Sequence, residues 1–400
     1  MDCRLRQRTE LTAGVAKLFV LFMNRGLDGW DGTGDFVKLD TGHGVPVSPD
    51  PLAGFPNGLG TPALVDTDLN GTVDWVYAGD QLGNLYRFDL CDRDADGNCA
   101  TNASGWSVTR LFTATYDDGT TEHVQPILSQ PLVLKHPSEQ GFLVVFGTGS
   151  YMTREDADSE AIQSIYAIWD RGSASPATAL ADSKELRLVE QTLTNVVDDS
   201  TDPAATRRVP SRNVVEYEPE AAGVPGTFGW YVDLDMPRAT TTNSGAVNSD
   251  SSGRPPPGAQ FPGEKAIRRF ILRNGALVTT TVLPSLDEFS CYGTRPGAIL
   301  VLSALNGGDH REPIIDFNDD GVIDEGDLLD VGSDDGVAAG LLFNQDQLDG
   351  ALVDLSTIGG DGDTDWLFAC GGNDCIPFRL QPPSDNRVGR LSWRELDGNN

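Results

Sequence analysis

Oxygen-bearing side chains alternate along the stretch DTDLNGTVD, which covers residues 66–74. Four of them stand at positions 1, 3, 5 and 9, and a glycine at position 6 allows a sharp bend, as in loops that wrap a hard cation. An ordinary turn without metal needs one or two such residues rather than four. The pattern therefore predicts a Ca²⁺ site. The predicted ligands are the side chains of Asp66, Asp68, Asn70 and Asp74 and the backbone carbonyl of Thr72.

A second stretch, DFNDDGVIDEGD at residues 316–327, fits the twelve-residue template of EF-hand-type loops. Aspartate replaces the usual glutamate at position 12, and its shorter side chain draws the exiting segment closer, as in dockerin-like loops. We expect a short helix over residues 325–330, packed through Leu328 and Leu329. The alternative is a solvated acidic run. The predicted ligands are Asp316, Asn318, Asp320, the backbone carbonyl of Val322, Asp324 and Asp327.

Two further acidic stretches depart from these templates. DRDADGNCA begins the same pattern but has Ala100 where the ninth ligand belongs, so we interpret it as a hairpin tip. DGDTD at residues 361–365 lacks the glycine at position 6 and is interpreted as an acidic turn. No G-x-S-x-G, H-E-x-x-H or P-loop motif marks an active site. The sequence gives no sign of an enzyme.

Composition favours an acidic, all-β protein. The 400 residues carry a formal net charge of −31, which disfavours nucleic acid and anionic membrane surfaces as partners. Clustered carboxylates repel one another, and bound divalent cations would relieve that repulsion. With 45 Gly and 24 Pro, the chain has many turns, and its 39% hydrophobic residues suffice for a large core.

The elements that must hold these loops are short strands arranged in three similar groups. The groups contain WVYAGDQLGNLYRFDL, FLVVFGTGSYM with SIYAIWD, and FILRNGALVTTTVLPS with GAILVLSAL. Each has a short apolar strand, a second strand ending at a small-residue turn, and a third. Such repetition predicts an all-β fold, a partial or modified β-propeller with four-stranded blades and inserted calcium-binding loops, although sandwich strands would look similar.

We expect residues 1–56 to form part of an incomplete blade and residues 57–396 to form the propeller region, with a flexible insertion at 237–263. The apolar start of the chain resembles a strand more than a signal peptide. If the protein is exported, its N-terminus is expected to lie upstream of this sequence. No stretch reaches the roughly 18 apolar residues of a membrane-spanning helix.

Six cysteines without any CxxC pair make zinc or haem ligation improbable. Cys91 with Cys99, and Cys370 with Cys375, are expected to form local disulfides, which favours an oxidising compartment. The pairing of Cys3 and Cys291 stays open.

In order and spacing, the segments NGLGTPALVDTDLNGTVDWVYAGDQLGNLYRFDL, GFLVVFGTGSYM, QSIYAIWD, GWYVDL and GRLSWREL resemble the C-terminal propeller of PilY-type type IV pilus biogenesis proteins, which are pilus-tip adhesins. The resemblance covers roughly residues 57–396. It implies that the loop at 66–74 binds calcium and helps the protein oppose pilus retraction. It also implies the pilus with its minor pilins and a host or abiotic surface as partners, and an extracellular location at the pilus tip, associated with the outer membrane and reached through the periplasm.

Departures from the family pattern limit what is carried over. Members have a secretion signal and a von Willebrand A-type region, and their propeller begins well before the calcium loop, whereas about 60 residues precede it here.

Two rival interpretations of the sequence remain open. A quinoprotein-like propeller dehydrogenase would need a polar cofactor pocket on the propeller axis. A dockerin-like scaffold module would carry two loops in tandem, and 316–327 alone fits that template.

Overall fold

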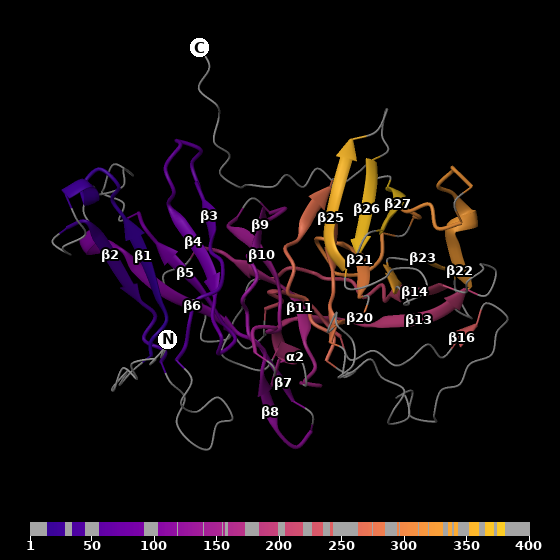
Figure 1. Cartoon of the computed structure of the whole chain (residues 1–400), viewed down its shortest axis with the longest axis horizontal. Coiled ribbons are helices and arrows are strands. Elements are labelled where there is room, and N and C mark those ends of the chain that lie inside the picture. The colour runs from indigo at the N-terminus through magenta and orange to yellow at the C-terminus, as the bar shows by residue number, and fades with distance from the viewer. Residues whose placement is uncertain are drawn as a thin grey trace, which may run out of the picture.

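The structure is a computed structural model. It describes residues 14–28, 34–44, 56–91, 103–172 apart from 118, 139, 154 and 157–158, 184–198, 205–218, 226–234, 241–242, 263–284 apart from 274, 294–342 apart from 296, 311, 319, 331–334 and 338–339, and 352–380 apart from 360–364 and 372–373. These residues form an all-β fold of several separate sheets, as the strand pattern predicts. In Figure 1 the sheets follow one another along the long axis of the molecule.

The first sheet is antiparallel and has the four strands expected of a propeller blade. Its central turn is organised by Asp80, whose buried carboxylate accepts hydrogen bonds from the Asn84 amide at 2.8 Å and the Tyr86 hydroxyl at 2.9 Å. Gly83 takes a φ of +76° in this turn, which an L side chain rarely adopts. The strands are β3 (Ala63–Val65), β4 (Trp75–Gly79), β5 (Asn84–Asp89) and β6 (Ser107–Thr113).

The second sheet packs against the first through a buried ion pair. The Arg87 guanidinium of β5 lies 2.7 Å from the Asp170 carboxylate, which also accepts a hydrogen bond from the Tyr77 hydroxyl at 2.8 Å. Breaking a buried pair of this kind leaves an uncompensated charge and is strongly destabilising. The strand order is β12 (Val189–Gln191), β15 (Gly229–Asp233), β11 (Ser164–Asp170), β10 (Phe142–Gly147) and β9 (Leu132–Lys135), with β12 parallel to β15.

The third sheet has seven strands, more than the four of a single propeller blade. The reason is a short strand, β24, which pairs with β14 on one side and β21 on the other and joins two strand groups into one sheet. The strand order is β16 (Thr241–Thr242), β13 (Leu193–Asp198), β14 (Ala205–Pro210), β24 (Gly340–Leu342), β21 (Ala298–Ser303), β18 (Ala276–Thr280) and β17 (Ile271–Arg273). Apart from β16 and Gly263, the predicted insertion lies outside the described residues.

A three-stranded sheet of β25 (Leu352–Gly359), β26 (Asp365–Gly371) and β27 (Asp374–Leu380) follows. Four two-stranded sheets pair β1 (Lys17–Leu21) with β2 (Phe36–Asp40), β7 (Thr115–Asp117) with β8 (Glu122–Val124), β19 (Leu283–Pro284) with β20 (Thr294–Arg295), and β22 (Leu328–Asp330) with β23 (Asp335–Val337). Helical turns are short: 3₁₀ segments η1 (Gly26–Asp28), η2 (Ala103–Gly105) and η4 (Glu325–Asp327), and α2 (Lys184–Arg187).

The largest core cluster combines the first two sheets with part of the third, and a second cluster joins the third sheet to β26 and β27. The N-terminal hairpin is packed on the first sheet. Leu18 of β1 and Leu39 of β2 contact a cluster that contains Val76, Tyr86 and Phe88. The strand expected near the start of the chain is therefore present, and it supports the sheet from which the loop at 66–74 projects.

Candidate metal centres

The stretch 66–74, called loop 1 from here on, connects β3 to β4. Its two ends are held by the sheet, because the Asp74 amide donates to the Val65 carbonyl at 2.9 Å and the Leu90 amide donates to the Asp74 carbonyl at 2.7 Å. Two residues take a positive φ, Leu69 at 60° and Gly71 at 89°. The chain thus turns sharply between two fixed strand ends.

Side-chain oxygens of loop 1 accept hydrogen bonds from the loop's own amides. The Gly71 amide at position 6 donates to Asp66 Oδ2 at 2.7 Å. The Asn70 amide donates to Asp68 Oδ1 at 3.2 Å, and the Thr72 amide donates to Asn70 Oδ1 at 2.8 Å. These contacts turn the predicted ligand side chains toward the inside of the bend.

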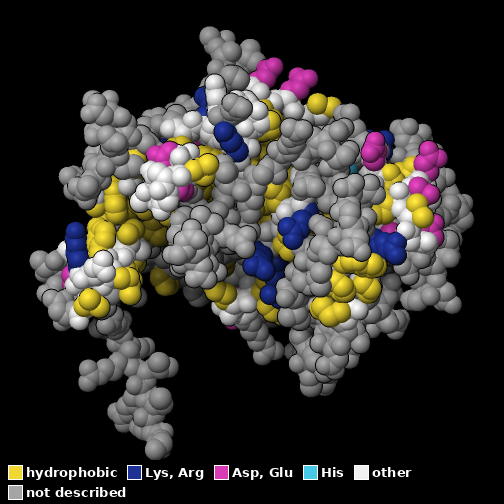
Figure 2. Space-filling model, turned by 90° about the horizontal axis from the view of Figure 1, so that it is seen from above, with side chains coloured by type: hydrophobic (Ala, Val, Ile, Leu, Met, Phe, Trp, Pro, Cys, Tyr) yellow, Lys and Arg dark blue, Asp and Glu magenta, His cyan; other side chains and the backbone are white. Residues whose placement is uncertain are grey.

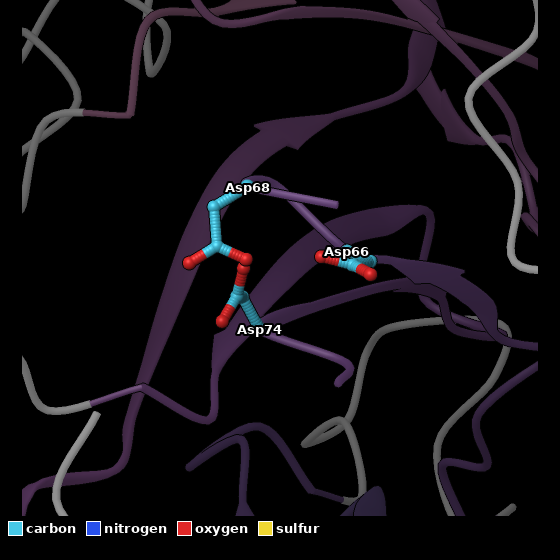
Figure 3. Close-up of side chains that lie close together, drawn as sticks. All are labelled: Asp66, Asp68 and Asp74. Atoms are coloured by element: carbon cyan, nitrogen blue, oxygen red, sulfur yellow. The ribbon is translucent and has the colours of Figure 1, made fainter. Parts of the chain in front are cut away.

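Three carboxylates of loop 1 converge. Asp66, Asp68 and Asp74 each offer an oxygen atom, and these atoms lie within 4.8 Å of one another. Figure 3 shows Asp68 and Asp74 pointing toward each other, with Asp66 beside them. Because calcium binds oxygens at about 2.3–2.6 Å, two ligands of one ion can be up to about 5 Å apart. The spacing of the three oxygens therefore fits a single ion.

Hydrogen bonds hold two of these carboxylates in place. Asp74 is fully buried, and its Oδ2 accepts hydrogen bonds from both the amide and the hydroxyl of Thr67. Burial raises the pKa of Asp66, but amide donors, chiefly Gly71 and Asn70, outweigh burial and hold the pKa below its ordinary value. The arrangement concentrates negative charge where a cation would neutralise it.

The stretch 316–327, called loop 2 from here on, repeats the same internal contacts 250 residues further along the chain. The Gly321 amide donates to Asp316 Oδ2 at 3.0 Å, and Gly321 has the same φ of 89° as its counterpart in loop 1. The Asp320 amide donates to Asn318 Oδ1 at 3.0 Å, and the Val322 amide donates to Asp320 Oδ1 at 2.8 Å. The contacts between positions 6 and 1, 5 and 3, and 7 and 5 are thus shared by both loops.

The loops differ in the residue that closes them. In loop 2 the amide of Phe317, at position 2, donates to Asp327 Oδ1 at 2.7 Å, where loop 1 uses the carboxylate at position 9. Asp324, at position 9, turns its Oδ1 to the Gly326 amide at 2.7 Å and caps η4. Burial raises the pKa of Asp327, and the amide donors, chiefly Phe317, offset this only in part. Loop 2 is therefore closed by its last predicted ligand.

The helix expected over residues 325–330 is wrong. A 3₁₀ turn ends at Asp327, Leu328 is extended with φ −75° and ψ 150°, and residues 328–330 form β22. Leu329 is buried against Val209 of the third sheet and beside Phe317. Pairing with β23 and this packing outweigh the local helical tendency.

One atom of loop 2 supports a cation directly. Asp316 is only 4% exposed, and its Oδ1 has no hydrogen-bond partner among the described residues. A buried carboxylate oxygen without a partner costs free energy, which a bound cation would recover. The described carboxylates of loop 2 do not gather as closely as the three of loop 1. The residues of both loops fit calcium, loop 1 through its cluster and loop 2 through this oxygen.

Two neighbouring side chains were not singled out from the sequence. Thr67 holds the carboxylate of Asp74, and its place inside the motif could have suggested this role. Arg379 of β27 donates to the Gly321 carbonyl, and the Asp316 amide donates to the Arg379 carbonyl at 3.2 Å. No local pattern connects Arg379 to a loop almost sixty residues earlier.

Among the described residues on the face shown in Figure 2, Asp and Glu side chains lie in separate groups, and several Lys and Arg side chains lie between these groups. The acidic stretch 92–100 and residues 361–364 lie outside the described residues, and Asp365 begins β26.

Among the described residues, no helix has the length and apolar character needed to cross a membrane.

The predicted disulfide between Cys370 and Cys375 is present and links β26 to β27. Cys91 is also disulfide-bonded, while Cys99 lies outside the described residues. Cys3 and Cys291 lie outside them as well.

Known proteins resemble this chain in sequence and in fold. The family model of the PilY1 beta-propeller domain matches residues 45–206, which include loop 1 but not loop 2. Type IV pilus biogenesis factor PilY1 of Pseudomonas aeruginosa (strain UCBPP-PA14) is 29% identical over 372 residues, covering 86% of this chain and 28% of that protein. A PilY1 homolog of Xylella fastidiosa (strain Temecula1 / ATCC 700964) is 26% identical over 364 residues, covering 90% of this chain and 24% of that protein.

The crystal structure of the Pseudomonas aeruginosa PilY1 C-terminal domain superposes with a TM-score of 0.61 at 23% identity, over 87% of this chain and 64% of that one. This likeness concerns the fold. The chain spans about a quarter of the length of the curated relatives it matches. The family model, the relatives and the shared fold all support the predicted resemblance of the chain to a PilY-type C-terminal β-propeller region.

Proposed function

We propose that this chain is a calcium-binding, non-enzymatic propeller region that supports type IV pilus biogenesis. The observation that carries the proposal is the cluster of three carboxylates in loop 1, which lies inside the segment matched by the PilY1 beta-propeller domain. The relatives are named as type IV pilus biogenesis factors. Because the chain covers only part of their length, the role of the whole protein is part of this proposal.

Calcium would act first on local order. In loop 1 the ion is held by the side chains of Asp66, Asp68, Asn70 and Asp74 and the carbonyl of Thr72. The bound ion would neutralise the converging carboxylates and so reduce the repulsion among them, which stabilises the bend that connects β3 to β4. In loop 2 the ligands are Asp316, Asn318, Asp320, Asp324, Asp327 and the carbonyl of Val322.

The ordered first loop would then serve the pilus. We infer that it takes part in opposing pilus retraction, that the region meets minor pilins at the pilus tip, and that it contributes to surface attachment. This places the region outside the cell after export through the periplasm. The Cys370–Cys375 disulfide supports an oxidising location. A dockerin-like role is less suited to the chain, because its two loops are separated by whole sheets rather than placed in tandem.

The test compares pili on cells that carry the full-length parent protein with Asp74→Ala or with Asp117→Asn. Asp117 is exposed, lies outside both loops, and loses the same charge. We expect Asp74→Ala to leave the protein folded and exported, to abolish calcium binding at loop 1, and to change the number of surface pili, while Asp117→Asn changes none of these.

Two results would contradict the proposal. If wild-type protein retains no calcium at micromolar free ion by native mass spectrometry, the metal sites are refuted. If Asp74→Ala loses one ion but piliation and twitching stay unchanged, loop 1 is a structural staple and has no part in the pilus cycle.

A further inference from the structure

A cavity of about 480 Å³ lies where the first three sheets meet, and its lining includes no residue of loop 1 or loop 2. It is lined by Thr61 just before β3, by residues 128–130 just before β9, by residues 149–152 after β10, and by residues 267–269 just before β17. Its volume falls within the roughly 300–1,000 Å³ of small-ligand sites. Nothing in the proposed pilus role uses this cavity.

The walls of the cavity are joined by backbone hydrogen bonds between sheets. The Thr61 amide donates to the Leu128 carbonyl at 3.1 Å, and the Ala266 amide donates to the Thr148 carbonyl at 3.0 Å. Segments from all three sheets are thus tied to one another at the cavity. A framework of this kind is formed before any ligand arrives, so that binding costs little ordering of the protein.

The side chains that line the cavity carry positive charge, although the chain as a whole is acidic. The chain has 60 Asp and Glu against 29 Lys and Arg, yet the lining contains Arg268 and Arg269 and no carboxylate. Both arginines are exposed, and neither has an ion pair or hydrogen bond with any residue that the structure describes. A guanidinium presents a planar fork of donors that matches a carboxylate in two-point contact.

The remaining lining is partly apolar. Leu128, Ile267 and Ile271 contribute aliphatic side chains, and Met152 is 64% exposed at the cavity. The segment that carries Met152 is held by Asp156, whose Oδ2 accepts hydrogen bonds from the Met152 amide at 2.8 Å and from the Ser150 hydroxyl at 2.8 Å. An adaptable methionine beside aliphatic groups suits an apolar side chain of a partner.

We propose that this cavity binds a carboxylate-bearing peptide segment of a partner protein. Arg268 and Arg269 take the carboxylate of an acidic side chain or a chain terminus, and the aliphatic wall with Met152 takes a neighbouring apolar side chain. The aliphatic groups beside the two arginines suit a peptide that carries an apolar side chain next to its carboxylate. The hydroxyl and amide groups of the lining can hydrogen-bond the peptide backbone; they belong to Thr61, Ser129, Gln130, Ser150, Tyr151 and Thr280.

The test uses two arrays of hexapeptides with randomised flanks, one holding Leu-Asp at the centre and the other Leu-Asn, probed with the labelled chain at 0.15 M salt. The strongest binder is then measured by fluorescence anisotropy. Arg268→Gln with Arg269→Gln should weaken binding at least tenfold. Arg25→Gln with Arg110→Gln is the matched control. Both arginines are exposed and lie outside the lining, and their replacement removes the same two positive charges. This control variant should change peptide binding less than twofold.

Each other outcome overturns the proposal. If the labelled chain binds neither array, or binds both arrays equally, the cavity does not bind a carboxylate-bearing peptide. An equal loss in the control variant shows unspecific attraction. Binding of trigalacturonate without peptide binding makes the site one for acidic sugars. Binding of an added quinone tricarboxylate with reduction of a redox dye makes it a cofactor site.

Discussion

Replacing Asp74 by asparagine should remove the calcium ion from loop 1 and leave loop 2 loaded. Asp74 is fully buried, and its carboxylate lies within 4.8 Å of those of Asp66 and Asp68. Asparagine keeps the size of the side chain and an oxygen that Thr67 can still contact. It removes one charge from the cluster and offers an NH₂ group that cannot bind a cation.

The magnitude follows from the geometry. Two unit charges 4.8 Å apart repel by about 1–3.5 kcal/mol for an effective dielectric constant between about 80 and 20. Without calcium, the substitution relieves two such pairs and weakens charge-assisted hydrogen bonds from Thr67 that are worth about 1.5–3 kcal/mol. The two effects oppose each other, so the metal-free variant should be close to wild type in stability. At calcium a hundredfold above Kd, wild type gains about 2.7 kcal/mol at this site, which the variant loses.

Hydrogen exchange over residues 63–79 measures this gain locally. About 2.7 kcal/mol corresponds to a roughly hundredfold slowing of exchange by calcium when opening of the loop requires release of the ion. We expect that slowing in wild type and in the control Asp117→Asn, and little in Asp74→Asn. Native mass spectrometry should count two ions in the first two proteins and one in the variant. Full calcium protection in Asp74→Asn, or loss of both ions, would refute the reasoning.

Three further predictions concern the rest of the molecule. Asp316→Ala should remove one calcium ion and leave exchange in loop 1 unchanged, which native mass spectrometry and hydrogen exchange check together; a change in loop 1 would mean that the sites are coupled. Burial lowers the pKa of His136 and of His310 to about 4, so the unfolded chain binds more protons between pH 6.5 and 4. The free energy of unfolding should therefore fall as the pH is lowered through this window, by up to about 3 kcal/mol for each histidine. Urea unfolding of wild type should have different midpoints at pH 7 and pH 4.5. The two midpoints should agree once both histidines are replaced by glutamine. Glu264→Gln should lower the free energy of unfolding by about 3–5 kcal/mol, because it leaves the fully buried Arg208 without its two-point partner; a loss below 1 kcal/mol in urea unfolding would contradict this.

The internal shape of both loops could be predicted from the sequence. The hydrogen bonds that the two loops share join residues two or five positions apart, so the alternation of oxygen side chains around Gly71 and Gly321 is enough to specify them. The strands around loop 1 could be predicted for the same reason. Short apolar runs ended by turn residues, such as Asp80 with Gly83, carry their own signals.

Other features depend on contacts between distant residues, and no local pattern contains them. Residues 328–330 become a strand because β23 pairs with them and Leu329 meets Val209. The seven-stranded sheet exists because β24 pairs with β14 on one side and with β21 on the other.

The sequence alone determined that the chain is acidic, all-β and furnished with two loops of calcium-type spacing, because composition and spacings of a few residues specify those properties. Tertiary structure decided that Arg379 supports loop 2. It also decided that Arg268 and Arg269 lie at a cavity between three sheets. The physical reason is that burial and charge proximity depend on how the sheets pack, and packing is set by many weak contacts between residues far apart in the chain.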